Sequence, residues 1–494
     1  MINYRAGNIA NTYELNQLIT KICPHWNFSK ESFEFINNRL NNLKQDLTFA
    51  IEYPYVDSIY RDSYYEYFAS KHIPYDRNSI RITLFSQEVN FEKLVDGNSE
   101  YIESFRSSFL GFIILRPTID RPVARSVISP KALKNHNFEI CLARYTIEFF
   151  GQKLSVNGFP HISQDGEAIT CAESSLWTLL EYYSSKYKDY NPITPSKLRK
   201  LIRSTTGRRM IPSNGLTIAE ISYAISELGF TSLVYHNKDQ SENILHEEIY
   251  TYIESGIPII LGLEAGENFR HAIVCFGHSI IDLAREVDKF EINSEKLIDI
   301  SCLPRNFISM DDNRTPYLEI QPNSLGVTYT KQTTAKITFA IVPLNKRIYM
   351  ESTIARALAK KILLEFKEIR ESREPLFIRL FLTTSRSFKQ SLFSPNTKMA
   401  KVIKKLLLYN SFPRFIWICE IGTAENFRNE QGQGLLILDA TGGNSNSSIL
   451  FYYFDKKLRN SKDLTSETDL NSRDSLLFSL YKNNLKGEWN DWET

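Results

Sequence analysis

The chain contains few cysteines, and none of them are closely spaced. Six cysteines are scattered over 494 residues without a Cys-x-x-Cys pair, so the sequence has neither the ligand spacing of a zinc site nor the framework of a disulfide-stapled domain. We therefore expect free thiols in a reducing compartment, most of them buried, since free cysteine is among the most buried residue types. No metal ion or organic cofactor is expected.

Long apolar segments and an excess of one charge are also missing. No stretch approaches the roughly 18–20 apolar residues that a membrane-spanning helix needs, and the first residues contain no apolar signal-peptide core. The 59 Lys and Arg residues nearly balance the 57 Asp and Glu residues, so the whole chain lacks the electrostatic footprint of a nucleic-acid or membrane-surface protein. These absences predict a soluble, cytoplasmic protein with no membrane association, and they argue against nucleic acid as a partner.

Length and composition predict a globular protein of several domains. Hydrophobic residues make up 42% of the chain and charged residues 23%, which are ordinary values for folded domains. At roughly 100–200 residues per domain, the length corresponds to about three domains. We place an α+β domain at 1–150, a central domain at 151–345 and a second flanking α+β domain at 346–494.

In the central part, predicted helices precede predicted strands, an order that favours an α+β domain. After a coil at Asn157–Gly166, apolar residues at helical spacing predict helices at Cys171–Lys186, Pro195–Arg203 and Thr217–Leu228. The strands are predicted at Ile257–Leu263, His271–Phe276, Phe307–Met310, Tyr317–Ile320 and Lys336–Val342.

One cysteine differs from the others by its place in this pattern. Cys171 stands at the first turn of a predicted helix, where backbone N–H groups and the helix dipole lower a cysteine pKa from ~8.5 to as little as ~3.5–7.5. Gln164 precedes it in the predicted coil, where its side-chain amide could stabilise an oxyanion beside the backbone N–H of Cys171. The two residues predict a nucleophile and an oxyanion hole for acyl transfer.

A thiolate nucleophile needs a base that also protonates the leaving group, and the base needs an orienting group. His271 begins an apolar strand that would hold its ring rigidly. Asp311 and Asp312 follow the strand Phe307–Met310, so pairing of the two strands would bring a carboxylate to the imidazole. We favour Asp311 because it follows the strand directly, with Asp312 as the alternative, although Asp311, Asp312 and Asn313 also form a typical turn cluster.

The combination of a glutamine, a cysteine that opens a helix, a strand with histidine and an aspartate at the next strand end resembles the papain-like cysteine peptidase superfamily. The segments Phe159–Gln164 and Gly256–Gly262 are most similar to those of the bacterial double-glycine peptidases, which process bacteriocin leaders. The resemblance covers only the middle of the chain. It implies a papain-like central domain, in which N-terminal helices pack on an antiparallel sheet.

The same resemblance implies a catalytic triad of Cys171, His271 and Asp311, with Gln164 in the oxyanion hole. The predicted function is that of a cytoplasmic bacterial cysteine protease that cleaves a peptide or isopeptide bond in a protein or peptide substrate. The flanking domains would recognise that substrate or a regulatory protein partner, within a bacterial defence or regulatory system.

Two alternatives stay open. Another papain-like chemistry, such as amidase activity or acyl transfer to an amine, would use the same residues with a different acceptor. The central domain could instead be a catalytically inactive binding or sensor module. Ala172 stands where the resembled families have glycine, and Glu173 adds an acid beside the thiolate unless it faces solvent at the helix N-terminus.

Two other histidines lie near the predicted site in the sequence. His278 follows the predicted strand and competes with His271 as a base, but we expect it at the surface. His161, in the predicted coil, is expected to shape the loop or to line the cleft.

Overall fold

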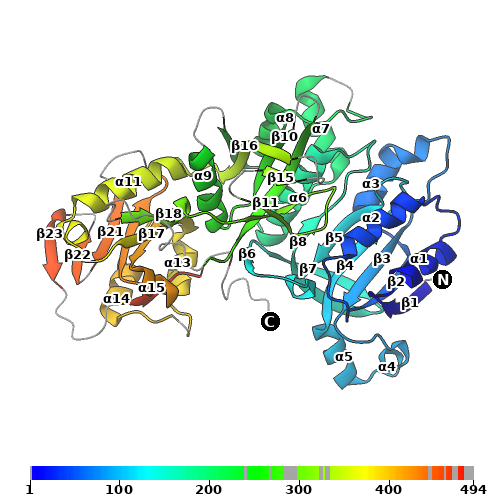
Figure 1. The fold of residues 1–494 in the computed structure, drawn as a ribbon, viewed down its shortest axis with the longest axis horizontal. Coiled ribbons are helices and arrows are strands. Elements are labelled where there is room, and N and C mark those ends of the chain that lie inside the picture. The colour runs from blue at the N-terminus through cyan, green and yellow to red at the C-terminus, as the bar shows by residue number, and fades with distance from the viewer. Residues whose placement is uncertain are drawn as a thin grey trace.

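The fold is described by a computed structural model for residues 3–207, 210–237, 242–265, 269–281, 297–321, 326–328, 334–395, 397–442, 448–454, 456–460, 463–469, 477–482 and 485. Within these ranges, three large sheets with their helices follow one another along the long axis of the molecule (Figure 1). Their pairings are antiparallel except for one parallel pair, so the predicted α+β class is confirmed. Among the described residues, no helix combines the length and apolar character needed to traverse a bilayer.

The first sheet contains seven strands in the order β1-β2-β3-β4-β5-β8-β7. Its strands are β1 Asn3–Asn8, β2 Thr48–Tyr55, β3 Ser79–Phe85, β4 Phe109–Leu115, β5 Val123–Ile128, β7 Ala143–Phe149 and β8 Gln152–His161. The helices between them are α1 Thr12–Ile22, α2 Lys30–Leu40, α3 Ser58–Glu66, α4 Phe91–Val95 and α5 Ser99–Ser107, with short 3-10 turns at Phe68–Ser70 and Pro130–Ala132.

The end of β8 corrects the coil predicted at Asn157–Gly166. Residues up to His161 form a strand that pairs with both β7 and β5. Asn157, Gly158 and Pro160 are typical of loops, but the glycine is needed for strand packing. A Cβ atom at Gly158 would lie 2.7 Å from the carbonyl oxygen of Ile128, so its absence lets β5 approach. Only the residues after His161 form the predicted loop.

The middle sheet contains eight strands, with six in the order β14-β13-β11-β10-β16-β15, β6 paired on β11 and β9 paired on β16. Its strands are β6 Phe138–Ile140, β9 Phe230–His236, β10 Ile259–Ala265, β11 Phe269–Ser279, β13 Phe307–Met310, β14 Leu318–Ile320, β15 Gly326–Thr328 and β16 Thr334–Asn345. The helices of this part are α6 Cys171–Lys186, α7 Pro195–Thr206, α8 Ile218–Glu227 and α9 Glu242–Glu254. All helices and strands predicted here are confirmed, whereas β6, β9, β15 and α9 were not predicted.

The third sheet contains seven strands in the order β12-β17-β18-β20-β21-β22-β23. They are β12 Leu297–Asp299, β17 Leu376–Thr384, β18 Phe415–Gly422, β20 Gly434–Asp439, β21 Ile449–Phe454, β22 Lys457–Asn460 and β23 Asp463–Asp469, beside a small pair of β19 Gln431–Gly432 and β24 Phe478–Ser479. Its helices are α11 Ser352–Glu365, α12 Lys367–Arg370, α13 Ser385–Ser391, α14 Lys401–Tyr409 and α15 Ala424–Arg428, and a 3-10 turn at Ile300–Cys302 follows β12.

Adjacent sheets are joined by exchanged strands. The short strand β6, from the N-terminal part of the chain, pairs with β11 of the middle sheet. Strand β12, from the middle of the chain, runs parallel to β17 in the third sheet. The rings of Phe159 on β8 and Phe276 on β11 stack with centroids 4.0 Å apart, so the first and middle sheets also share a hydrophobic core.

The crossing of β6 over β11 predicts a sensitive glycine. A Cβ atom at Gly277 would lie 2.3 Å from Cγ2 of Ile140 and 2.5 Å from the carbonyl oxygen of Glu139. We expect Gly277→Ala to lower the free energy of unfolding by about 1–3 kcal/mol, because the added methyl forces β6 away from β11. Urea denaturation measures this change. The exposed strand substitution Thr146→Ala should stay within about 0.5 kcal/mol of wild type, and an equally small effect at Gly277 would contradict the prediction.

Candidate active site

The nucleophile candidate is the first residue of α6. Thr170 is the N-cap, and its backbone N–H and hydroxyl donate to Oε2 of Glu173 at 2.7 and 2.6 Å. The hydroxyl of Ser213 donates to the same carboxylate. Of the alternatives for Glu173, the position facing solvent is wrong, since the residue is 2% exposed, but it does cap the N-terminus of the helix. Burial raises the pKa of Glu173, partly offset by these hydrogen bonds.

Helix α6 is fixed against the strand that carries the base. Every residue from Ala172 to Tyr183 is buried, as expected for a helix enclosed on all sides. Ser175, one turn after Cys171, donates its hydroxyl to the backbone carbonyl of Ala272 at 2.9 Å. Because Ala272 follows His271 on β11, this hydrogen bond holds the start of the helix beside the imidazole.

His271 meets both candidate aspartates. Strands β11 and β13 pair in antiparallel register with Val274 opposite Met310, which brings the residues after Met310 to the imidazole. Nε2 of His271 lies 3.0 Å from Oδ1 of Asp311 and 3.2 Å from Oδ1 of Asp312. The pairing of β11 with β13, on which the prediction of an orienting carboxylate depended, is thus confirmed. Asp312 lies almost as close to the ring as Asp311 does.

The imidazole is set up to carry a proton. Burial disfavours the charged ring, but hydrogen bonds with Asp311 and with the Cys171 thiol, together with both carboxylate charges, raise the pKa of His271 well above its ordinary value. Since Nε2 faces the carboxylates, Nδ1 is the ring nitrogen that can serve the thiol. The charged ring therefore lies beside Cys171, the first residue of α6.

The turn that supplies the carboxylates also holds the oxyanion candidate. The side-chain amide of Gln164 donates to Oδ1 of Asn313 at 3.0 Å, and its backbone N–H donates to Oδ2 of Asp312 at 3.3 Å. The backbone N–H of Asn313 donates in turn to Oδ1 of Asp311 at 2.8 Å. Three consecutive residues therefore position both the base and the glutamine.

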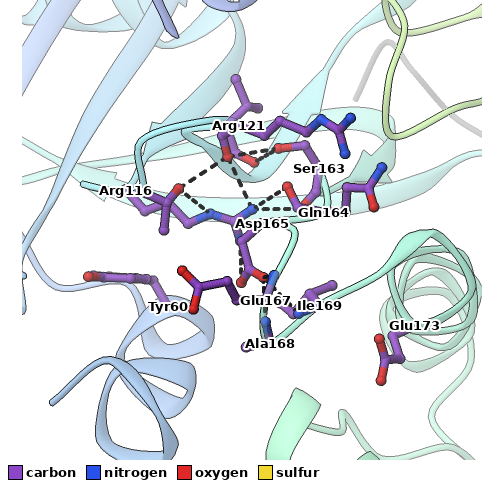
Figure 2. A network of polar contacts seen from close by, with 12 residues as sticks. Tyr60, Arg116, Arg121, Ser163, Gln164, Asp165, Glu167, Ala168, Ile169 and Glu173 are labelled. Atoms are coloured by element: carbon purple, nitrogen blue, oxygen red, sulfur yellow. Dashed lines mark hydrogen bonds and ion pairs between the residues drawn. The ribbon is translucent and has the colours of Figure 1, made fainter. Parts of the chain in front are cut away.

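A second set of contacts shapes the loop between Gln164 and the helix (Figure 2). Oδ1 of Asp165 accepts from the backbone N–H groups of the loop residues Glu167, Ala168 and Ile169 at 2.7–3.0 Å. The buried guanidinium of Arg116, at the end of β4, donates to the carbonyls of Ser163 and Gln164 at 2.7 and 2.9 Å. The backbone on which Gln164 depends is thus fixed from the first sheet.

Sequence reasoning missed two arginines of this region. Arg116 holds the loop, and Arg39 of α2 donates to the carbonyls of Asp311 and Asp312. Each lies far from the site in sequence, next to ordinary helix or strand-end residues, and no local pattern distinguishes it from a surface arginine. Only the burial of each guanidinium, at 3% exposure for Arg39 and 1% for Arg116, shows that it has an internal role.

The two other histidines are both buried. The expectation of a surface position for His278 is wrong, because it is 3% exposed within β11 and its Nε2 lies 2.8 Å from Oε2 of Glu254. It is seven positions from His271 along the same strand, about 23 Å, so it does not serve Cys171. His161 ends β8, and its Nε2 accepts from Arg39 at 3.0 Å. Burial, and then the charge of Arg39, lower the pKa of His161 well below its ordinary value.

Two groups among the described residues could hold a metal ion. Ligand atoms lie within 4.8 Å of one another in each group, which are His271 with Asp311 and Asp312, and His278 with Glu139 and Glu254. Imidazole nitrogen with carboxylate oxygens suits several divalent metals. In the first group a metal ion would have to displace the Nε2 proton of His271 that Asp311 accepts and that lies beside the charge of Asp312.

No protein-family model and no curated protein matches the chain. The resemblance to papain-like peptidases therefore stays a prediction that rests on the residues and their geometry.

The second carboxylate predicts a characteristic pH dependence of stability. Burial raises the pKa of Asp312 to about 6, with His271 lowering it, Asp311 raising it, and Arg39 and Arg121 lowering it. The raised pKa means that ionisation costs folding energy as pH increases through about 6. Asp312→Asn has no such cost, so wild type should lose stability relative to the variant between about pH 4 and about pH 7, by on the order of 1–3 kcal/mol.

Urea unfolding of wild type and Asp312→Asn across this pH range tests the sign. A stability difference that is constant with pH, or one that moves in favour of wild type as pH rises, would contradict the assignment.

Proposed function

We propose that the protein is a cysteine hydrolase of the papain-like type, with Cys171 as nucleophile and His271 as base. The observation that carries the proposal is the set of contacts made by the imidazole of His271. It interacts with a helix-opening cysteine and, through Nε2, lies within 3.2 Å of two buried carboxylates. A nucleophile, a base and an orienting acid in contact are the arrangement that activates a thiol for acyl transfer.

The proposed reaction has two halves, formation of a thioester on Cys171 and its hydrolysis, and the residues of the site act in both. The Cys171 thiolate attacks the acyl carbon, and the oxyanion receives hydrogen bonds from the Gln164 amide and the backbone N–H of Cys171. The imidazolium of His271 gives its proton to the leaving amine, which departs and leaves a thioester. Water then attacks the thioester while His271 takes the water proton, and the acid product leaves as the thiolate returns.

The contacts favour an active enzyme over an inactive module. An inactive site would tolerate separation of Cys171 from His271, yet Ser175 holds α6 and β11 together one turn from the cysteine. Glu173 does not contact the thiol group as an unpaired acid, because its carboxylate is committed to Thr170 and Ser213. The substrate class we propose is a peptide or isopeptide bond, with transfer of the acyl group to an amine as the alternative.

Thiol reactivity tests the proposal without a known substrate. We expect iodoacetamide to alkylate Cys171 about tenfold faster than Cys302 near neutral pH, although Cys302 is the more exposed thiol. Cys171 has an imidazolium partner, whereas burial raises the pKa of the Cys302 thiol to about 12. His271→Ala should abolish this preference. The labelled residues are identified by mass spectrometry across a pH series.

Either of two outcomes would contradict the proposal. Cys171 could label no faster than Cys302, or it could label equally fast without His271. If the preference holds, digestion of a peptide mixture with and without an added amine distinguishes hydrolysis from acyl transfer by product mass. Cys171→Ala, which lacks the nucleophile, serves as the matched control.

A further inference from the structure

The guanidinium of Arg39 is buried at the back of the candidate site. It belongs to α2 of the first sheet and is 3% exposed. Nη1 donates to the carbonyl of Asp311 at 3.2 Å and to Nε2 of His161 at 3.0 Å, and Nη2 donates to the carbonyl of Asp312. The ring of Phe35 lies 4.5 Å below its central carbon. The contacts therefore converge on the backbone of the turn that orients His271.

The partners of Arg39 are unusual for a buried arginine. Burial lowers its pKa, but only to about 10, with Asp312 and Asp311 acting against that change, so the group keeps its charge at neutral pH. A buried charge is costly unless it is paired and hydrogen-bonded. Here the direct bonds go to two carbonyls and a neutral imidazole, while the charge itself faces the two carboxylates of the same turn. The arrangement fits a group that fixes the turn and balances its negative charge.

We infer that Arg39 is a positioning residue for the proposed reaction, holding the Asp311–Asp312 turn against His271 from the N-terminal sheet. The inference rests on the proposed function of Cys171 and His271. Arg116 does the same for the loop of Gln164, and Figure 2 shows how its guanidinium reaches that backbone. Both the acid turn and the oxyanion loop are thus held by arginines of the first sheet. We conclude that the central segment alone does not make a working site.

The inference has an electrostatic consequence that a purely structural contact would lack. Asp312 is faced by His271, Asp311, Arg39 and Arg121, and its charge also acts on Arg116. Removing the charge of Arg39 raises the pKa of Asp312 further, so the carboxyl is protonated at a higher pH. Over that pH range the imidazolium of His271 then lies beside one carboxylate anion instead of two. The acid limb of the pH profile, in which Cys171 reacts more slowly as the pH falls, therefore moves to higher pH.

The experiment measures iodoacetamide alkylation of Cys171 across pH in full-length wild type, Arg39→Met and Arg39→Lys. We expect Arg39→Met to label about tenfold more slowly near neutral pH, with the acid limb shifted upward by about one pH unit. Arg39→Lys keeps the charge but loses the planar fork that serves two carbonyls at once. It should therefore keep the acid limb of wild type while labelling more slowly.

Arg305→Met is the matched control. Arg305 is also a buried guanidinium over an aromatic ring, 3.9 Å from the centroid of Tyr250, and it also donates to a backbone carbonyl, that of Ile300. Among the described residues, its hydrogen bond and its ring contact go to Ile300 and Tyr250 and not to the candidate site, so its removal should leave the labelling profile of Cys171 unchanged. Thermal unfolding of each variant shows which ones are folded.

The outcomes separate the two proposals. If wild-type Cys171 is no more reactive than Cys302, the proposed function fails before Arg39 is tested. If wild type is reactive and Arg39→Met keeps its rate and its acid limb, the function stands and the role of Arg39 is overturned. If Arg39→Met does not fold, the alkylation rate of Cys171 in Arg39→Lys tests the inference instead. A rate equal to that of wild type overturns the inference, and a slower rate with an unchanged acid limb supports it.

Discussion

Three consecutive residues after β13 connect all parts of the candidate site. Asp311 accepts from His271, and Asp312 lies beside the same ring nitrogen. Asn313 and Asp312 hold Gln164, and the carbonyls of the same turn accept from Arg39. The position of this turn depends on the pairing of β13 with β11 and on the closure of α2 over it. The chemistry proposed for Cys171 therefore depends on a backbone segment that no longer has freedom to move once these bonds form.

Two adjacent buried carboxylates create the main energetic problem of this site. Like charges at close range and in low dielectric raise each other's energy. Burial raises the pKa of Asp312, and the charge of Asp311 raises it further. The structure offsets the cost with cations on different sides, namely His271 on β11, Arg39 on α2, and Arg116 and Arg121 near the ends of β4 and β5. Removing one member of such a network leaves the others buried and unpaired, which is far more destabilising than the network is stabilising.

The sequence predicted what depends on local pattern. Cys171 at the start of α6, His271 on β11 and the acids after β13 follow from helical and strand periodicity, and the structure brings them together as expected from strand pairing. It did not predict the strand at Asn157–His161, since loop-type residues stand there for packing reasons. Nor did it predict Arg39 or the burial of Glu173 and His278. Those depend on contacts between segments more than 100 residues apart or on which face of an element is covered, and periodicity does not carry that information.

The long separation between Arg39 and its partners also bears on how the protein is made. The arginine lies 272 residues before Asp311, so at about 5–20 residues per second the ribosome delivers the turn roughly 14–54 seconds after it delivers α2. During that interval, closing the first sheet around α2 would bury a cation that has His161 but neither the carbonyls nor the carboxylates of the turn, which is unfavourable. We therefore expect α2 to dock last among the elements of its own sheet. A nascent chain would then carry an unassembled site until the middle sheet is complete, and Cys171 would lack its proposed base and acids until that point.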